Sequence, residues 1–224
     1  MSRGQTASLN RKGRETRELL LEATIISIAR NGLAGLSHRA VAARADVSLA
    51  LTTYYFANKQ DMVAQAFSHS VERGRPSLAD LDTALTGYAK AWRTGADRIE
   101  TIDLMARRAV AFVVETDQRS RDGIAFELEF FYHTRLEPRL AKLVSDYRHF
   151  ILGAARRFCM LCGSTTPNVD AELLVGLVLR LESEHMSTAF DTSEAHMHAQ
   201  FERLFDTILA QKPPVALRNA GAAS

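Results

Sequence analysis

The sequence predicts an all-α protein, and two observations support this prediction. Glycine and proline, the residues that most often interrupt helices, number 12 and 5 among 224 residues. Apolar residues recur at helical spacing along most of the chain, whereas the alternating pattern of β-strands is scarce. A hydrophobic content of 46% with 24% charged residues is ordinary for a soluble globular protein. The length allows one large domain or two modest ones, each with a buried core.

The first predicted helix runs from Arg14 to Asn31. Gly32 follows it and is expected to end the helix in the left-handed conformation that glycine adopts readily. Residues 1–13 lack periodicity, and we expect them to form a disordered basic arm. The residues expected on the inner face of the helix are Leu20, Leu21, Thr24, Ile25 and Ile28.

Residues 37–56 predict two short helices joined by a tight turn. Ser37 and Ser48 are placed to cap the two helices, because a serine hydroxyl can accept hydrogen bonds from the unpaired N–H groups of a first turn. Asp46 lies in the turn, and the second helix runs to about Tyr55. The apolar face of the first helix consists of Val41, Ala42 and Ala45. This arrangement is typical of a helix-turn-helix, whose second helix can enter the DNA major groove.

The second helix of this pair has two sides. At 100° per residue, Leu49, Ala50, Thr53 and Tyr54 fall on one side, and Leu51, Thr52 and Tyr55 lean to the other. A helix of two turns is not stable alone, so the surrounding apolar residues must hold it. The functional interpretation is a DNA recognition helix with the first side outward. The alternative is an ordinary pair of packed helices in an all-α core.

A fourth helix follows Asn58, with Asp61 in a capping-box arrangement. Residues 74–76, Gly-Arg-Pro, are expected to end it, and we place a domain boundary there. Several of the later helices are apolar on more than one face, which is typical of helices that are buried on all sides or line a cavity. Residues 212–224 are expected to form a flexible tail. Further helices are predicted over residues 77–93, 96–116, 121–136, 138–162, 170–189 and 193–211, with breaks at Gly95, Asp117–Ser120, Pro138 and Gly163–Pro167.

The net charge of +2 conceals an asymmetry along the chain. Residues 1–60 hold nine Lys and Arg against four acids, a balance of +5, and the rest holds 19 bases and 22 acids, a balance of −3. Positive charge is therefore concentrated around the predicted helix-turn-helix, as phosphate binding requires. The alternative is that a basic N-terminus is merely a solvated tail.

Over residues 14–74 the chain resembles the tetracycline-repressor (TetR) family of bacterial transcriptional regulators. Two positions depart from the family pattern. Asp46 replaces the usual turn glycine, which is tolerable because Asp visits the left-handed region more readily than most residues. Thr53 stands where the family often has a phosphate-contacting tyrosine. The matching positions are Asn31-Gly32, Leu36-Ser37, Val41-Ala42, Ala45 to Ser48, Tyr55-Phe56 and Lys59.

The resemblance implies an N-terminal helix-turn-helix DNA-binding domain over residues 14–74 and a C-terminal helical effector-binding and dimerisation domain over residues 77–211. In the first domain we expect contacts with double-stranded DNA. Leu49 and Ala50 could meet thymine methyl groups. The residues expected at base edges are Leu49, Ala50, Thr53 and Tyr54, and those expected at phosphates are Ser37, Arg39, Ser48, Tyr55 and Lys59.

In proteins that this chain resembles, the last two helices pair with their symmetry mates in a homodimer. Two-fold symmetry suits DNA binding, because two short recognition helices can read a palindromic operator. The alternative is that the same apolar stripes form a hairpin in the core of one chain. The residues expected at the dimer interface are Leu174, Leu177, Leu181, Phe201, Leu204, Phe205 and Ile208.

Repression in such proteins is relieved by a small-molecule effector, and we expect a moderately hydrophobic one. The alternative is that the candidate lining residues only fill the core. The apolar candidates are Trp92, Leu104, Phe112, Phe126, Phe130 and Leu177, and Glu129, Tyr132 or His133 could supply polar contacts.

Two short sequence patterns could indicate a metal, redox or catalytic site, but each of them is incomplete. Cys159 and Cys162 form a CxxC, but no further ligands lie at zinc-finger spacing and the pair precedes a predicted helix C-terminus, so we expect structural cysteines. Glu182 and His185 have the ligand spacing of di-iron helical bundles, which need a second such motif and two further carboxylates. A di-iron oxidase that uses Glu182 and His185 is therefore an unfavoured alternative function.

The sequence as a whole favours binding over catalysis. It has no phosphate-binding glycine loop, no nucleophile elbow and no other catalytic set, so we predict neither enzyme activity nor a cofactor or bound metal. It also has no signal peptide and no apolar run long enough to cross a bilayer, so the cytoplasm is the expected compartment. The predicted function is a homodimeric repressor that a small molecule releases from its operator, with activation left open.

Overall fold

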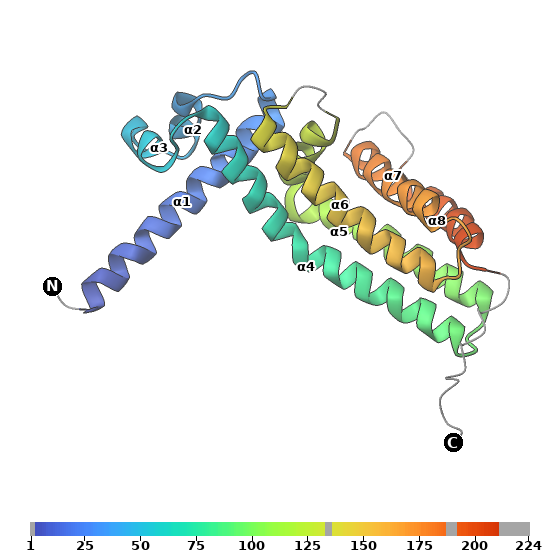
Figure 1. The fold of residues 1–224 in the computed structure, drawn as a ribbon. Coiled ribbons are helices and arrows are strands. Elements are labelled where there is room, and N and C mark those ends of the chain that lie inside the picture. The colour runs from blue at the N-terminus through green and yellow to red at the C-terminus, as the bar shows by residue number, and fades with distance from the viewer. Residues whose placement is uncertain (1–2, 133–135, 187–191, 211–224) are drawn as a thin grey trace. The chain divides into compact units, whose positions relative to one another are not determined.

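The computed structural model describes residues 3–132, 136–186 and 192–210, without the side chains of residues 3–11, 116–120 and 132. These residues form helices and no strand, which confirms the all-α prediction (Figure 1). None of the helices in this part of the chain is long and apolar enough to cross a membrane. The helices are α1 (Arg3–Asn31), α2 (His38–Arg44), α3 (Leu49–Tyr55), α4 (Lys59–Arg93), α5 (Arg98–Tyr132), α6 (Pro138–Leu161), α7 (Pro167–His185) and α8 (Glu194–Ile208).

The chain divides into two compact units. Unit 1 comprises residues 1–75 and 118–148, and unit 2 comprises residues 76–117 and 149–224. Unit 1 therefore holds α1 to α3 with the first part of α4, the last part of α5 and the first part of α6. Unit 2 holds the remainder of these three helices with α7 and α8. Residues 118–148, which the sequence assigned to the second domain, lie with the helix-turn-helix in unit 1.

The core of unit 1 is built around an aromatic cluster. Phe67 on α4 packs edge-on against Phe130 on α5 and Tyr147 on α6, with ring centroids 5.4 Å and 6.0 Å away. The predicted inner face of α1 is also buried, including Leu20 and Ile28 at 0% and 1% exposure. Helices from three parts of the sequence thus give the helix-turn-helix a rigid base.

The core of unit 2 is made by the second part of α4 with α5, α6, α7 and α8. Phe205 on α8 lies between two other rings, stacked on Phe201 at 6.1 Å and edge-on to Phe158 at 6.0 Å. Arg98 on α5 ties down the end of α8, because its guanidinium donates to Asp206 and to the Leu209 carbonyl oxygen. These contacts fix α8 against the start of α5.

The first helix begins earlier than the sequence predicted. α1 starts at Arg3, whereas a disordered arm was expected over residues 1–13 and a helix only from Arg14. No proline interrupts this stretch, so the helical hydrogen bonds can continue. The Thr16 hydroxyl donates to the Lys12 carbonyl oxygen at 2.9 Å, and the Tyr55 hydroxyl donates to that of Gly13 at 3.0 Å.

Two predicted helix breaks are absent. α4 runs through residues 74–76 although Pro76 removes one N–H from the helical ladder. The carbonyl oxygen that loses this donor belongs to Glu72, which is an exposed residue. The border between the two units nevertheless falls between Arg75 and Pro76. α5 likewise runs through residues 117–120, where neither glycine nor proline interrupts it.

Candidate nucleic-acid interface

The turn between α2 and α3 has the geometry that the sequence predicted. The Ser37 hydroxyl caps α2 by accepting a hydrogen bond from the Ala40 amide at 3.2 Å. Asp46 adopts the left-handed conformation with φ of 52°, which turns the chain out of α2. The Val47 amide then donates to the Ala42 carbonyl oxygen at 3.0 Å, the bond that closes a Schellman motif.

α3 is held in place from its inner side. Thr52 is completely buried, and its hydroxyl donates to the Leu49 carbonyl oxygen at 2.8 Å and lies 3.2 Å from His38 Nδ1 on α2. Phe56, the residue that ends α3, and Val41 on α2 are also fully buried. These contacts supply the packing that a seven-residue helix needs, because such a helix is too short to be stable by itself.

The outer side of α3 lies at the surface. Tyr54 is 80% exposed and Leu49 is 45% exposed, and Ala50 and Thr53 are exposed as well. These are the four residues that the sequence assigned to the outward side. Thr53 turns its hydroxyl to the Ala50 carbonyl oxygen at 3.0 Å, which leaves its methyl group and the Tyr54 ring as the prominent features. This surface offers apolar contact and one phenol to a base-pair edge.

Three of the five predicted phosphate contacts are also exposed, namely Ser37, Arg39 and Ser48. Ser48 occupies the N-cap position of α3 without making a side-chain cap hydrogen bond. Its hydroxyl is therefore available at a helix N-terminus, where backbone N–H groups favour an anion. Ser48 directly precedes α3, whereas Ser37 and Arg39 lie at the start of α2.

The other two predicted phosphate contacts make internal hydrogen bonds. The Tyr55 hydroxyl donates to the Gly13 carbonyl oxygen, and the Lys59 ammonium donates to the Leu33 carbonyl oxygen at 2.6 Å. An ammonium has three donors, so Lys59 keeps two for other partners. Tyr55 and Lys59 thus brace the helix-turn-helix, a role that spacing in the sequence did not indicate because their partners, Gly13 and Leu33, lie far away in the chain.

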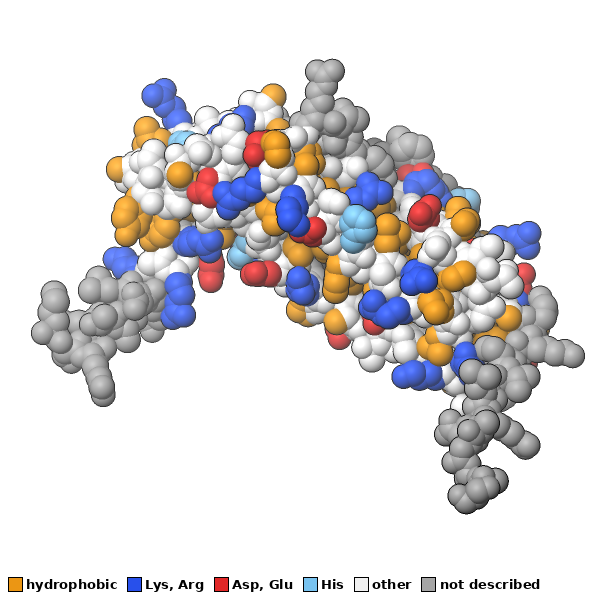
Figure 2. Space-filling view, in the orientation of Figure 1, with side chains coloured by type: hydrophobic (Ala, Val, Ile, Leu, Met, Phe, Trp, Pro, Cys, Tyr) orange, Lys and Arg blue, Asp and Glu red, His pale blue; other side chains and the backbone are white. Residues whose placement is uncertain are grey.

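Basic and hydrophobic side chains lie together over the part of unit 1 that holds α2 and α3 (Figure 2). Arg44 on α2 anchors itself to α1, because its Nε donates to the Ser27 hydroxyl at 3.0 Å. Arg39 is exposed on the same helix. A surface with arginine beside apolar side chains combines attraction to phosphates with contact to base edges.

Comparison with known proteins agrees with this geometry. The family model described as bacterial regulatory proteins of the tetR family matches residues 20–66, which include all of α2 and α3. Over these residues the chain matches the TetR family. Residues 20–66 therefore carry a helix-turn-helix DNA-binding domain of the tetR type, as the sequence predicted. No curated protein matches the sequence significantly.

The fold extends the likeness over most of the chain. A transcriptional regulator from Rhodococcus sp. Rha1 is 20% identical with a TM-score of 0.65, covering 89% of this chain and 98% of that one. A putative TetR-family regulator from Mesorhizobium loti MAFF303099 is 13% identical with a TM-score of 0.61, covering 88% and 96%. The multidrug binding protein EbrR, solved with imidazole, is 24% identical with a TM-score of 0.57, covering 85% and 89%. At these identities the comparison establishes a shared fold.

The structure buries most of the residues that were predicted at the dimer interface. Leu174, Leu181, Phe201, Phe205 and Ile208 are each at most 6% exposed. They belong to the core of unit 2, and Leu177 and Leu204 are half-buried against it. These five side chains pack within one chain, as the hairpin alternative expects, and the dimer interface stays a prediction. The apolar surface of α7 consists instead of Val169 and Leu173, which are 55% and 54% exposed.

The predicted effector-pocket residues are divided between the two units. Trp92, Leu104, Phe112 and Leu177 belong to unit 2, whereas Phe126, Glu129 and Phe130 belong to unit 1. Trp92, Phe126 and Phe130 are almost fully buried, and Leu104 is 38% exposed. Tyr132 lies at the end of α5 without a described side chain, and His133 lies outside the described residues. The pocket therefore stays a prediction.

The structure contains a groove that the sequence did not indicate. It lies in unit 2 between the start of α5 and the outer side of α8 and encloses about 290 Å³. The sequence feature that could have indicated the groove is Ile99, an isoleucine beside charged residues, which is 73% exposed. The groove is lined by Arg98, Ile99, Ile102, Ala199, Glu202, Arg203 and Asp206.

The two other patterns from the sequence lie on α6 and α7. Cys159 and Cys162 are free thiols and completely buried, and burial followed by the charge of Asp170 raises the pKa of Cys159 to about 12. A thiol so placed is a poor nucleophile. Glu182 is buried and His185 half-buried on α7. Among the described residues, no group of three or more His, Cys, Asp or Glu side chains is placed to hold a metal ion.

Proposed function

We propose that this TetR-family chain is a homodimeric repressor that binds a palindromic operator in the bacterial cytoplasm. The observation that carries the proposal is the outward side of α3, with Tyr54 80% exposed on a helix braced by buried Thr52 and Phe56. Exposed apolar side chains on a recognition helix have a natural use in contacting thymine methyl groups and base edges. The exposed Ser37, Arg39 and Ser48 would set the register by binding phosphates.

A dimer follows from the size of the recognition helix. α3 has seven residues and reaches only a few base pairs, too few for a specific genomic site. The proposed contact with the second copy is the exposed side of α7, where Val169 and Leu173 are uncovered. Gly176 lies along the same side, and no other atom lies within 4 Å of where its Cβ would be. Another helix can therefore approach closely there.

The proposed repressor is released by a small, moderately hydrophobic effector. EbrR, which shares the fold, is described as a multidrug binding protein and was solved with imidazole. The apolar residues predicted for the pocket of this chain, including Trp92 and Phe112, suit a ligand of that character. Release requires that the effector bind the DNA-competent state more weakly than the incompetent one.

The proposal is tested by selecting DNA with the purified protein from fragments of its own genome. We expect the enriched fragments to share an inverted repeat whose half-site centres lie about one DNA turn, or a multiple of it, apart. Affinity for such a duplex should fall linearly with salt on logarithmic axes. Failure to enrich any fragment, or enrichment of unpaired half-sites, would contradict the palindrome-binding dimer.

A further inference from the structure

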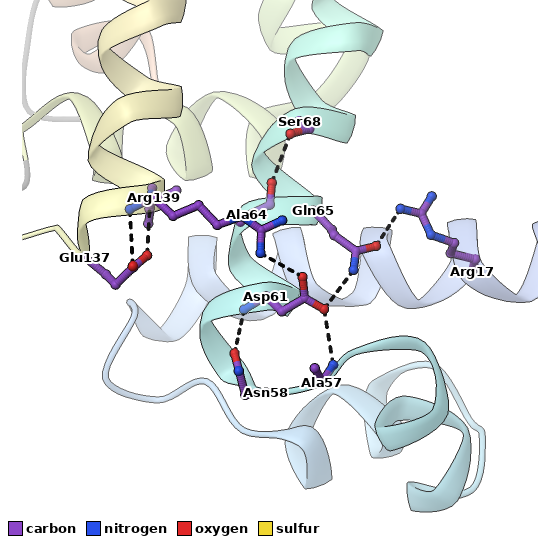
Figure 3. Close-up of polar contacts among 10 residues, drawn as sticks. Arg17, Ala57, Asn58, Asp61, Ala64, Gln65, Ser68, Glu137 and Arg139 are labelled. Carbon is purple, nitrogen blue, oxygen red and sulfur yellow. Dashed lines mark hydrogen bonds and ion pairs between the residues drawn. The ribbon is translucent and has the colours of Figure 1, made fainter.

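The carboxylate of Asp61, in the first turn of α4, is the centre of a hydrogen-bond network that joins four parts of unit 1 (Figure 3). Its Oδ2 accepts from the Ala57 amide at 3.2 Å and from Gln65 Nε2 at 2.9 Å. Its Oδ1 accepts from Arg139 Nη1 on α6 at 3.1 Å. The amide of Asp61 itself donates to Asn58 Oδ1 at 2.8 Å, which is half of the predicted capping box.

The bond to Ala57 matters for DNA binding because of where Ala57 lies. It directly follows Phe56, the buried residue at which α3 ends. The turn at residues 56–58 joins α3 to α4, so its conformation sets the orientation of α3 relative to α4. The Asp61 carboxylate binds the middle of this turn. Gln65 links the network to α1, because its Oε1 accepts a hydrogen bond from Arg17 Nη2 at 2.5 Å.

Arg139 adds a contact from outside the helix-turn-helix, 78 residues along the chain from Asp61. Its place at the start of α6 is fixed locally, because the Glu137 carboxylate accepts from the amides of Arg139 and Leu140 at 3.2 Å and 3.3 Å. Asp61 is 18% exposed and Arg139 is 62% exposed. Such an exposed ion pair contributes little to global stability. Its effect is to restrain the turn that orients α3.

We infer that Arg139 is a positioning residue for DNA recognition: through Asp61 it holds the turn after α3 in the DNA-competent orientation without touching DNA itself. The inference rests on the proposed function, because it assigns Arg139 a part in operator binding. Loss of the Arg139 contact would loosen the turn at residues 56–58 and weaken operator binding.

The inference is tested first on the protein without DNA. Arg139→Gln removes the charge and keeps most of the side chain. Lys142→Gln is the matched control, since Lys142 lies on the same helix and pairs with Asp146 on that helix at 2.7 Å. We expect hydrogen exchange in the peptide that contains Ala57 to be about fivefold faster in Arg139→Gln and unchanged in Lys142→Gln. Equal exchange in wild type and Arg139→Gln would overturn the inference, whether or not the protein binds an operator.

The second arm uses two labelled duplexes of equal length, the fragment most enriched from the genome and a mixed sequence. We expect Arg139→Gln to weaken binding to the enriched duplex about fivefold. Its affinity for the mixed duplex and the salt slope of its binding should match wild type. Lys142→Gln should change neither the ratio of affinities for the two duplexes nor the hydrogen exchange at the turn. A salt slope lower by about one unit would instead make Arg139 a direct phosphate contact and overturn the inference.

A double-mutant cycle separates the pair from two independent effects. Asp61→Asn keeps the shape of the side chain and removes its charge. We expect Arg139→Gln to cause no further loss of affinity for the enriched duplex on the Asp61→Asn background. Losses that add in the double variant would show that the two residues act separately, against the inference. Wild-type protein that binds neither duplex would refute the proposed function, and the exchange arm alone would then decide the inference.

Discussion

α3 and α7 both carry apolar side chains that the sequence predicted to meet a partner, and the structure treats them differently. On α3 the predicted contacts lie at the surface, with Leu49 and Tyr54 45% and 80% exposed. On α7 the predicted contacts lie inside the protomer, with Leu174 and Leu181 6% and 0% exposed. Helical spacing grouped the exposed residues of α3 correctly. The side of α7 that meets a second copy stays a prediction.

The difference has a physical cause. α3 has one side that packs inward through buried Thr52 and one side of mixed polarity. The buried apolar residues around α3 therefore determine which side faces outward. α7 has apolar residues on two sides, and consecutive leucines fall on opposite ones: Leu173 is 54% exposed and Leu174 is 6% exposed. Helical spacing alone does not show which of two apolar sides is buried, because that depends on the helices that pack against them.

The largest effect expected from this comparison is at Phe201. Phe201→Ala should lower the free energy of unfolding by about 3–5 kcal/mol, because it empties a fully buried ring site beside Phe205. Leu173→Ala, on the exposed side of α7, should change it by about 0.5 kcal/mol or less for the protomer and should weaken dimerisation. Urea unfolding at two protein concentrations, with sedimentation, measures both. A loss for Phe201→Ala that vanishes at high protein concentration would return Phe201 to the dimer interface.

A smaller effect is expected at two neighbouring tyrosines of α3. Tyr54→Ala should leave stability unchanged and reduce discrimination between operator and mixed-sequence DNA by about 1–3 kcal/mol, because Tyr54 is 80% exposed on the outward side. Tyr55→Phe should instead lower the free energy of unfolding by about 1 kcal/mol, because the hydrogen bond to the Gly13 carbonyl oxygen is lost. Fluorescence polarisation and urea unfolding separate the two results. Reversed outcomes would exchange the roles of the two residues.

The sequence predicted most of the helix-turn-helix because its signals are local. The Ser37 cap, the left-handed Asp46 and the outward side of α3 depend on residues within a few positions of each other. What the sequence did not predict depends on long-range packing. The bond from Tyr55 to Gly13 spans 42 residues and the pair of Asp61 with Arg139 spans 78. The continuity of α4 through Pro76 likewise runs against the local signal, because proline ordinarily interrupts a helix.

The smallest effect expected is a pH dependence of unit 1, at the base that carries α3. Burial raises the pKa of the Glu127 carboxyl above its usual value, although hydrogen bonds from Ser70 and Tyr147 oppose the rise. The folded protein therefore holds a proton on Glu127 more tightly than the unfolded chain does. The stability that this group contributes is full at pH below the usual glutamate pKa and is lost as pH rises from that value through the folded pKa.

Glu127→Gln should remove this dependence. Relative to wild type, the variant should gain stability as pH rises above the usual glutamate range, and the gain should level off once Glu127 is ionised in folded wild type. Glu72→Gln, an exposed change of equal charge on α4, is the control. Urea unfolding across the acidic to neutral range measures the difference. A difference that stays constant with pH would mean that Glu127 has the same pKa in the folded and unfolded states, and one that grows as pH falls would mean that its folded pKa is lowered. Either result would show that burial does not govern its protonation.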